Sequence, residues 1–222
     1  MLLTEALELP SEQMHRVDYF LNLGKPLGID TGRRDYELFI SDEDRKNAKA
    51  LLDRKAVKES DFLAVINPGA NWEPKRWPRQ NFARLCDELA GRFSAKVIIT
   101  GSKRDIALAK DILLLVKSKP VVACGETTLK ELAAIFERAN LVIANDSGPM
   151  HIAVAVKAKT IALFGPTSPH ITGPIGQGRY AVLYKQAGCD VPCYDLSCGD
   201  YKCMGAITPQ DVLEAAEKIL KI

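Results

Sequence analysis

A short polar turn between two apolar runs carries the residues whose types and spacing suggest chemistry most directly. The turn spans residues 145–151 (NDSGPMH), between the apolar runs 141–144 and 152–156. This pattern predicts a buried strand, a tight turn and a helix whose first backbone amides point out of the turn. Such amides are unpaired and carry a partial positive charge, so they can hold phosphate oxygens. Taken alone, the stretch favours an ordinary strand–helix loop capped by Asp146 or Ser147, so the rest of the chain must decide.

A second polar loop, residues 67–78, follows the apolar run 62–66 and contains the adjacent cations Lys75 and Arg76. Its prolines stiffen it and present the two cations near the end of the preceding strand. Two cations facing the turn at 145–151 would suit a pyrophosphate. The alternative is a solvated basic pair with no ligand.

Two further loops, residues 101–105 and 124–128, also follow apolar runs. Asp105 is either a first-turn acid of the next helix or a carboxylate that accepts ribose hydroxyls. His151 could also contact a ligand, but a lone histidine in the first turn of a helix is usually structural or exposed. In an open α/β sheet, loops beyond the carboxyl ends of the strands converge on one ligand site. We therefore expect the four loops to form a single site.

Several other functions are disfavoured. No G-x-G-x-x-G fingerprint follows a strand and no G-x-x-x-x-G-K-[ST] loop occurs, which argues against ordinary dinucleotide binding and P-loop phosphoryl transfer. The net charge of +2 indicates no nucleic-acid partner. No apolar run approaches the roughly 20 residues of a membrane span, and no secretory signal is visible. We expect a cytoplasmic location and leave open a peripheral association with the inner membrane.

The elements that must position these loops follow from the apolar pattern. Buried strands are predicted at residues 62–66, 96–100, 121–123, 141–144 and 160–164, with a further strand at 180–184. Helices are predicted at residues 79–91, 104–117, 128–138 and from 148, with a last helix starting at 208. Strands that alternate with helices predict an α/β fold, a Rossmann-like parallel sheet with helices on both faces.

The first 60 residues differ from the rest of the chain. They contain a helical pattern at 14–23, a turn-rich stretch at 25–37 and a helix starting with the acidic cap 41–44. We therefore predict that residues 1–60 form a helical connector and that residues 61–222 form the Rossmann-like domain.

Three motifs together resemble glycosyltransferase family 9, the ADP-heptose:lipopolysaccharide heptosyltransferases. They are N-P-G-A with K-R-W-P at 67–78, N-D-S-G-P-M-H at 145–151 and F-G-P-T-S-P at 164–169, and the resemblance covers roughly residues 60–222. It implies the GT-B fold, built of two Rossmann-like halves, of which the C-terminal half binds the nucleotide sugar. The other half binds the acceptor and supplies an acidic general base. Residues 1–60 do not resemble that half. They would form the connector that leads to it.

The resemblance also implies roles for individual residues. The catalytic residues would be Lys75, which neutralises the diphosphate, and Asp146, which reaches the heptose hydroxyls. Asp105 would hold the ribose, and Glu126, Thr127 and Thr128 would border the adenine. The amides of Ser147, Gly148 and Met150 would lie near the phosphates, and His151 against the sugar-diphosphate. The remaining substrate-binding candidates lie on the same loops and are Asn67, Asn71, Arg76 and Gly101. No metal or cofactor is implied.

The function implied is heptosyl transfer from ADP-heptose to a lipopolysaccharide core acceptor, with this chain as the donor-binding part. The alternatives are a nucleotide-sugar-binding module without catalysis, or another GT-B-like sugar-nucleotide enzyme such as an epimerase. An epimerase would need a pair of catalytic carboxylates facing the sugar, and Asp146 alone does not provide one.

Four of the six cysteines lie within the loop 189–203, with the spacing C-x3-C-x4-C-x4-C. This spacing lacks the C-x2-C pairs of a strong zinc site. We expect a structural loop or a conditional disulfide, and a metal site remains the alternative. Cys86 and Cys124 lie in apolar contexts and are expected to pack as small hydrophobic residues.

Overall fold

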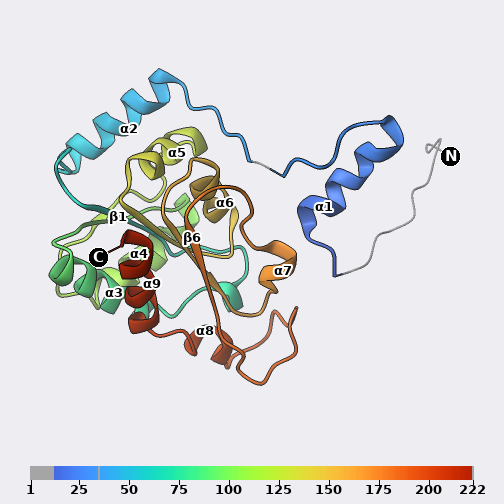
Figure 1. Cartoon of the computed structure of the whole chain (residues 1–222). Coiled ribbons are helices and arrows are strands. Elements are labelled where there is room, and N and C mark those ends of the chain that lie inside the picture. Colours follow the sequence, from blue (N-terminus) through green and yellow to red (C-terminus); the bar gives the residue numbers. More distant parts are fainter. Residues whose placement is uncertain (1–12, 35, 222) are drawn as a thin grey trace.

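A six-stranded sheet forms the centre of the molecule (Figure 1). The computed structural model describes residues 13–34 and 36–221. All adjacent strands pair in parallel, in the spatial order β3-β2-β1-β4-β5-β6. The strands are β1 (Leu63–Asn67), β2 (Lys96–Ile99), β3 (Val121–Val122), β4 (Leu141–Asn145), β5 (Thr160–Phe164) and β6 (Tyr180–Tyr184).

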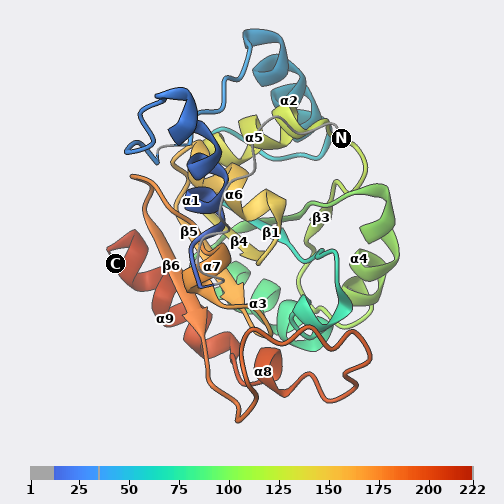
Figure 2. The ribbon, with the colours of Figure 1, turned by 90° about the vertical axis from the view of Figure 1, so that its right-hand side faces the viewer.

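Helices cover both faces of this sheet (Figure 2). One face packs against α3, α4 and α9, and the other packs against α2, α5 and α6. The α-helices are α1 (Arg16–Leu21), α2 (Asp42–Arg54), α3 (Arg79–Arg92), α4 (Ile106–Leu113), α5 (Leu129–Arg138), α6 (Gly148–Ala155), α7 (Pro169–Thr172), α8 (Lys202–Gly205) and α9 (Pro209–Leu220). The 3₁₀ helices are η1 (Asn22–Leu27), η2 (Glu73–Lys75) and η3 (Lys103–Asp105).

The strands are apolar throughout because both of their faces are covered. Within β1, Ile66 belongs to the core on the α3 side, while Val65 belongs to the core on the α2 side. This alternation follows from the two-residue repeat of a strand. The all-apolar run of β1 is therefore the pattern of a central parallel strand.

Side-chain caps fix the starts of several helices. Ser41, Thr128 and Thr208 each accept from the amide three residues later, and an Asp or Glu at that position reaches back to the cap. These reciprocal capping boxes satisfy two otherwise unpaired amides at each helix start. The cap predicted at 41–44 and the helix start predicted at Thr128 are both present.

The sheet order places the ligand-binding edge. Strands β1 and β4 are neighbours, with Asn67 paired to Ala144, and the chain continues outward from them in opposite directions. A parallel sheet has a crevice at such a switch point, beyond the carboxyl ends of the two strands. The loops that begin at 67 and 145 therefore start side by side.

The helix α2 packs against the core of the sheet, although it lies within residues 1–60, which were predicted to form a connector. Its Ala48, Leu51 and Leu52 are buried against the α5 side of the core. The α1 helix, in contrast, stands apart from the sheet (Figure 1). The helix α2 therefore packs on the core of the sheet, and the domain boundary at residue 61 stays a prediction. Residues 1–12, 35 and 222 lie outside the described residues.

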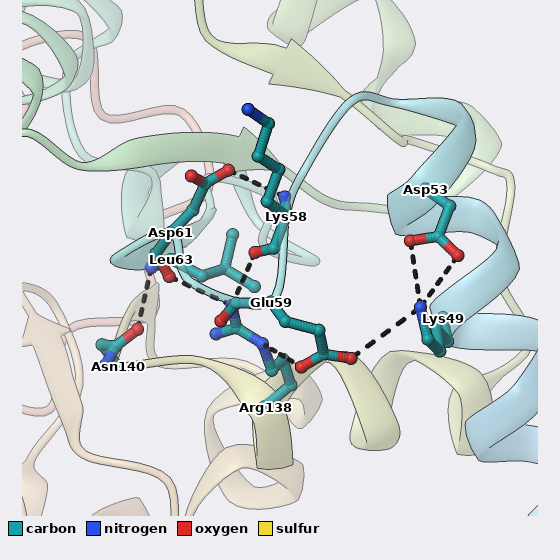
Figure 3. Close-up of polar contacts among 8 residues, drawn as sticks. All are labelled: Lys49, Asp53, Lys58, Glu59, Asp61, Leu63, Arg138 and Asn140. Carbon is teal, nitrogen blue, oxygen red and sulfur yellow. Dashed lines mark hydrogen bonds and ion pairs between the residues drawn. The ribbon is translucent and has the colours of Figure 1, made fainter.

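A single arginine ties α5 to the segment that precedes β1 (Figure 3). The Arg138 guanidinium donates to the carbonyls of Lys58, Glu59 and Asp61 at 2.7–3.0 Å. The Asn140 side chain accepts from the Leu63 amide at 2.8 Å. These contacts satisfy backbone groups of the turn that leads from α2 into the sheet.

The predicted fold class is confirmed, and the differences lie at element ends. The helix predicted at 104–117 begins with η3 and ends at Leu113. The short helices α7 and α8 lie in loops where the sequence predicted none. No helix in the described ranges is long and apolar enough to cross a membrane.

Candidate active site

A cavity of about 690 Å³ opens at the carboxyl edge of the sheet. Residues from the four predicted loops and from the start of α5 line it together. They are Asn67, Gly69, Ala70, Asn71, Arg76, Gly101, Ser102, Arg104, Asp105, Thr127, Thr128, Leu129, Leu132, Ser147, Gly148 and Pro149.

Most of the candidate site residues line this cavity, and five do not. Those in the lining are Asn67, Asn71, Arg76, Gly101, Asp105, Thr127, Thr128, Ser147 and Gly148. The five outside the lining are Lys75, Glu126, Asp146, Met150 and His151. Lys75 and Asp146 are the sequence neighbours of lining residues and lie beside the cavity rather than in its wall.

Lys75 and Asp146 form a buried ion pair. Lys75 Nζ lies 2.6 Å from Asp146 Oδ2, and their side chains are only 15% and 5% exposed. Lys75 also lies over the Trp72 ring, 5.2 Å from its centroid. Because burial removes water from both charges, each depends on the other for stabilisation. The pair links the loop after β1 to the turn after β4.

Two threonines complete the surroundings of the Asp146 carboxylate. Thr167 Oγ1 donates to Asp146 Oδ2 at 2.6 Å, and Thr172 Oγ1 donates to the same oxygen at 3.3 Å. Thr167 belongs to the motif at 164–169, but no role was predicted for either threonine from the sequence. The motif itself could have indicated Thr167. It runs on from the end of β5, which pairs in parallel with β4, so its residues lie at the same edge of the sheet as Asp146.

A buried asparagine holds the loop 67–78 against β4. Asn145 Nδ2 donates to the Pro68 carbonyl at 2.8 Å, and Asn145 Oδ1 accepts from the Trp77 amide at 3.3 Å. The buried Trp77 indole donates to the Ile207 carbonyl at 2.8 Å. Asn145 therefore fixes both ends of the loop that carries Lys75.

Arg76 has a structural contact in addition to its place in the cavity wall. Its Nε and one terminal nitrogen donate to the Ala70 carbonyl at 3.2 and 3.1 Å. This contact closes the loop on itself. A guanidinium has five N–H donors, so Arg76 keeps donors for a ligand.

Asp105 fits its position because two glycines lie against it. A Cβ added at Gly69 would lie 2.5 Å from Asp105 Oδ1, and one added at Gly101 would lie 2.8 Å from Asp105 Cβ. Asp105 Oδ2 accepts from the amide and hydroxyl of Ser102 at 2.7 Å. The carboxylate is thus held at the cavity wall by the helix cap it forms.

Glu126 was predicted to border the adenine, but it pairs with a lysine outside the cavity. Its Oε1 lies 2.6 Å from Lys55 Nζ, at the end of α2. Thr127 and Thr128 line the cavity, and Thr128 also caps α5. The loop therefore contributes its threonines, and not its glutamate, to the cavity wall.

The helix α6 begins at the cavity without a side-chain cap. Ser147 Oγ donates to the Asn145 carbonyl, and Asp146 is held by Lys75. A Cβ added at Gly148 would meet no atom within 4 Å, so the first turn faces open space. The Met150 amide donates to the Ser147 carbonyl at 3.1 Å, and the Met150 side chain is buried in the core.

His151 lies one helical turn after Gly148, on the same face of α6. Burial lowers the pKa of His151, while the nearby Asp146 carboxylate opposes this change. The imidazole is therefore neutral near pH 7. Its Nδ1 lies 3.1 Å from the hydroxyl of Tyr36, a residue of the segment between η1 and α2. No role was predicted for Tyr36 from the sequence.

The Cys-rich loop packs behind the loop that carries Lys75. Cys189, Cys193, Cys198 and Cys203 are free and line one cavity of about 250 Å³, together with Pro74. Tyr194 contacts the edge of the Trp72 ring at 5.6 Å between centroids. Within residues 13–34 and 36–221, no three His, Cys, Asp or Glu side chains are placed to hold a metal ion.

Comparison with known proteins identifies relatives of this chain. The sequence model described as glycosyltransferase family 9 (heptosyltransferase) matches residues 2–197. Lipooligosaccharide heptosyltransferase 2 of Campylobacter jejuni is 32% identical over 163 residues, which is 70% of this chain and 50% of that protein.

Two solved structures extend the match to the fold. A family 9 glycosyl transferase from Veillonella parvula superimposes with a TM-score of 0.86 and 31% identity, over 99% of this chain and 64% of that one. ADP-heptose lps heptosyltransferase II of E. coli gives a TM-score of 0.70 and 26% identity, over 83% and 53%. The chain spans about half the length of the curated relatives it matches. The match over most of its length shows that this chain belongs to glycosyltransferase family 9.

Proposed function

We propose that this chain is the donor-binding part of a heptosyltransferase that transfers heptose from ADP-heptose to a lipopolysaccharide core acceptor in the cytoplasm. The observation that carries the proposal is the cavity at the β1/β4 edge, with the α6 N-terminus in its wall and Lys75 paired to Asp146 beside it. Membership of the family supports the reaction class. The acceptor site and the general base are assigned to the part of the relatives that this chain does not span.

In this proposal Lys75 stabilises the ADP leaving group. An ammonium has three N–H donors, and the ion pair with Asp146 uses one of them. Lys75 can therefore bind a phosphate oxygen without releasing Asp146. Together with the α6 amides and Arg76, it places positive charge where negative charge develops on the diphosphate.

Asp146 would bind the transferred sugar. Lys75, Thr167 and Thr172 converge on its Oδ2. Oδ1 is a second acceptor that can receive a hydrogen bond from a sugar hydroxyl. The neighbouring cations keep this carboxylate close to the diphosphate, despite the like charge.

The adenosine would occupy the opposite end of the cavity. Asp105 lies there and would accept from the ribose hydroxyls, while Thr127 and Thr128 would border the base. The apolar side chains of Leu129 and Leu132 in the same wall offer a surface for a planar ring.

Calorimetric titration with ADP tests the site. Lys75→Ala should weaken ADP binding at least about tenfold, because a charge-assisted hydrogen bond contributes about 1.5–3 kcal/mol. Lys185→Ala is the matched control, since Lys185 forms an equally short but more exposed ion pair with Asp211 on the α9 side. Unchanged ADP affinity in Lys75→Ala would contradict the assignment.

Because Asp146 is buried, Lys75→Ala could lower stability as well as affinity. Gly148→Ala removes this ambiguity, since its added methyl group meets no protein atom and enters the cavity. It should fold normally and bind ADP more weakly.

A thermal-shift series with ADP, UDP and GDP sugars tests the identity of the donor. Preference for UDP or GDP compounds would contradict ADP-heptose as the donor.

A further inference from the structure

The segment between η1 and α2 contacts the domain through Ile40, which packs on the core, and through Tyr36. Phe39 of this segment is 78% exposed, and Leu27 before it is 77% exposed. Tyr36, in contrast, is half-buried and lies with its ring at right angles to the His151 ring, 5.7 Å between centroids. Tyr36 therefore joins the segment before α2 to the helix at the proposed donor site.

The Tyr36 hydroxyl keeps its proton near neutral pH. Burial raises the pKa of Tyr36 above its ordinary value, so the phenol stays protonated there. The hydroxyl then has its own proton to donate. His151 Nδ1, 3.1 Å away, is placed to accept it.

This contact selects one form of the imidazole. A neutral histidine carries its proton on one ring nitrogen and accepts on the other. When Nδ1 accepts from Tyr36, the proton must lie on Nε2. Nε2–H is then a hydrogen-bond donor, whereas the other tautomer would present a lone pair there.

A donor is the useful form beside a sugar-diphosphate, whose oxygens accept hydrogen bonds. His151 and Gly148 are three residues apart on α6 and share a helix face, and Gly148 lines the cavity. The charges of Lys75 and Asp146 also act on His151. A lone pair at Nε2 would instead repel phosphate oxygens.

We propose that Tyr36 is a positioning residue that fixes His151 as its Nε2–H tautomer, so that His151 donates to the sugar-diphosphate. This inference rests on the proposed function for the ligand, but the tautomer itself is independent of it. Tyr36, a residue of the segment that precedes α2, would then be part of the donor site.

Nitrogen NMR of the imidazoles in the 222-residue chain tests the tautomer. The chain has three histidines, and His151→Gln identifies the signals of His151. In the unchanged chain the Nδ1 shift should be that of an unprotonated nitrogen and the Nε2 shift that of a protonated one. Tyr36→Phe should give a mixture of tautomers. A protonated Nδ1 in the unchanged chain, or an unaltered spectrum in Tyr36→Phe, would overturn the proposal.

The matched control is Tyr19→Phe, which removes a hydroxyl from α1 in the same N-terminal segment. The ring of Tyr19 packs on Phe20, at a centroid distance of 5.5 Å. Its removal should leave the His151 signals in place. A change as large as that in Tyr36→Phe would mean that general loosening of the segment, and not the hydroxyl, alters His151.

Titration with ADP, through a double-mutant cycle, tests the consequence for the ligand. Tyr36→Phe should weaken ADP binding about fivefold, the order expected for one hydrogen bond. In the His151→Ala background the same change should have no further effect, because Tyr36 acts through His151. An equal loss in both backgrounds would overturn the positioning role. Absence of ADP binding by the unchanged chain would contradict the proposed function instead, and the nitrogen spectra distinguish the two failures.

Discussion

At the scale of residues, the Asp146 carboxylate is held by three donors of unequal strength. Thr167 donates at 2.6 Å in a buried site, whereas Thr172 donates at 3.3 Å and is partly buried. Lys75 supplies the balancing charge. The threonine hydroxyls fix the orientation of the carboxylate, because an ion pair with a flexible lysine does not fix it by itself.

Removal of these hydroxyls should therefore have graded effects on stability. Thr167→Val should lower the free energy of unfolding by about 2 kcal/mol, since a buried hydrogen bond to a charged group is lost. Thr172→Val is the matched control and should cost less than about 1 kcal/mol. Urea unfolding measures both values, and equal losses would contradict the ranking.

The histidine on α6 predicts a pH dependence of stability. Burial lowers the pKa of His151, so on acidification the unfolded chain takes up a proton before the folded chain does. Stability should then be full above about pH 6.5 and fall as the pH is lowered through this value. Urea unfolding between pH 7.5 and 5 measures the slope.

His151→Gln should flatten that slope, because glutamine does not titrate. His170→Gln replaces an exposed histidine on α7 and should follow the profile of the unchanged chain. A profile of His151→Gln as steep as that of the unchanged chain would assign the pH dependence to other groups.

At the scale of elements, Arg138 joins the end of α5 to the turn between α2 and β1 (Figure 3). One terminal nitrogen serves three carbonyls of residues 58–61. This contact fixes the turn that connects α2 to β1, and α2 covers part of the core. Helix packing at this end of the molecule therefore depends on a polar contact as well as on apolar burial.

Arg138→Ala should lower the free energy of unfolding by about 2 kcal/mol, because several carbonyls lose a charged donor. Arg92→Ala is the control, since Arg92 forms an exposed pair with Glu88 one turn earlier in α3. It should cost less than about 0.5 kcal/mol. Thermal and urea unfolding of both variants provide the comparison, and similar losses would mean that the Arg138 contacts add little.

At the scale of the whole molecule, the reactivity of the cysteine thiols measures how well the core excludes solvent. Burial raises the pKa of Cys86 and of Cys124 to about 12. At pH 8 only about one molecule in ten thousand then carries the reactive thiolate at either site. Cys189, Cys193 and Cys198, in contrast, are partly exposed on the loop beside the site.

Labelling of the folded chain with a thiol reagent at pH 8, followed by peptide mass spectrometry, tests this contrast. The loop cysteines should react, while Cys86 and Cys124 should stay unlabelled until urea unfolds the chain. The cysteines that react in urea provide the internal control. Rapid labelling of Cys86 in the folded chain would mean that the α3 side of the core opens easily.

The sequence by itself determined the sheet and the loops at its edge. An apolar strand or an amphipathic helix is specified by local repeats, and caps such as Ser41 and Thr128 are specified by residues three apart. The polar loops after the strands at 62–66 and 141–144 were predicted to converge, and they line one cavity. The motifs in these loops also pointed to the family to which the chain belongs.

Only the tertiary structure decided which side chains meet. The pairing of Lys75 with Asp146, of Glu126 with Lys55 and of Tyr36 with His151 joins residues 71 to 115 positions apart. No local repeat encodes such contacts, because they depend on the strand order and on where each loop turns. The helix α2 was predicted to belong to a connector for the same reason. Its apolar face is buried only because α5 packs against it, and the sequence does not show that contact.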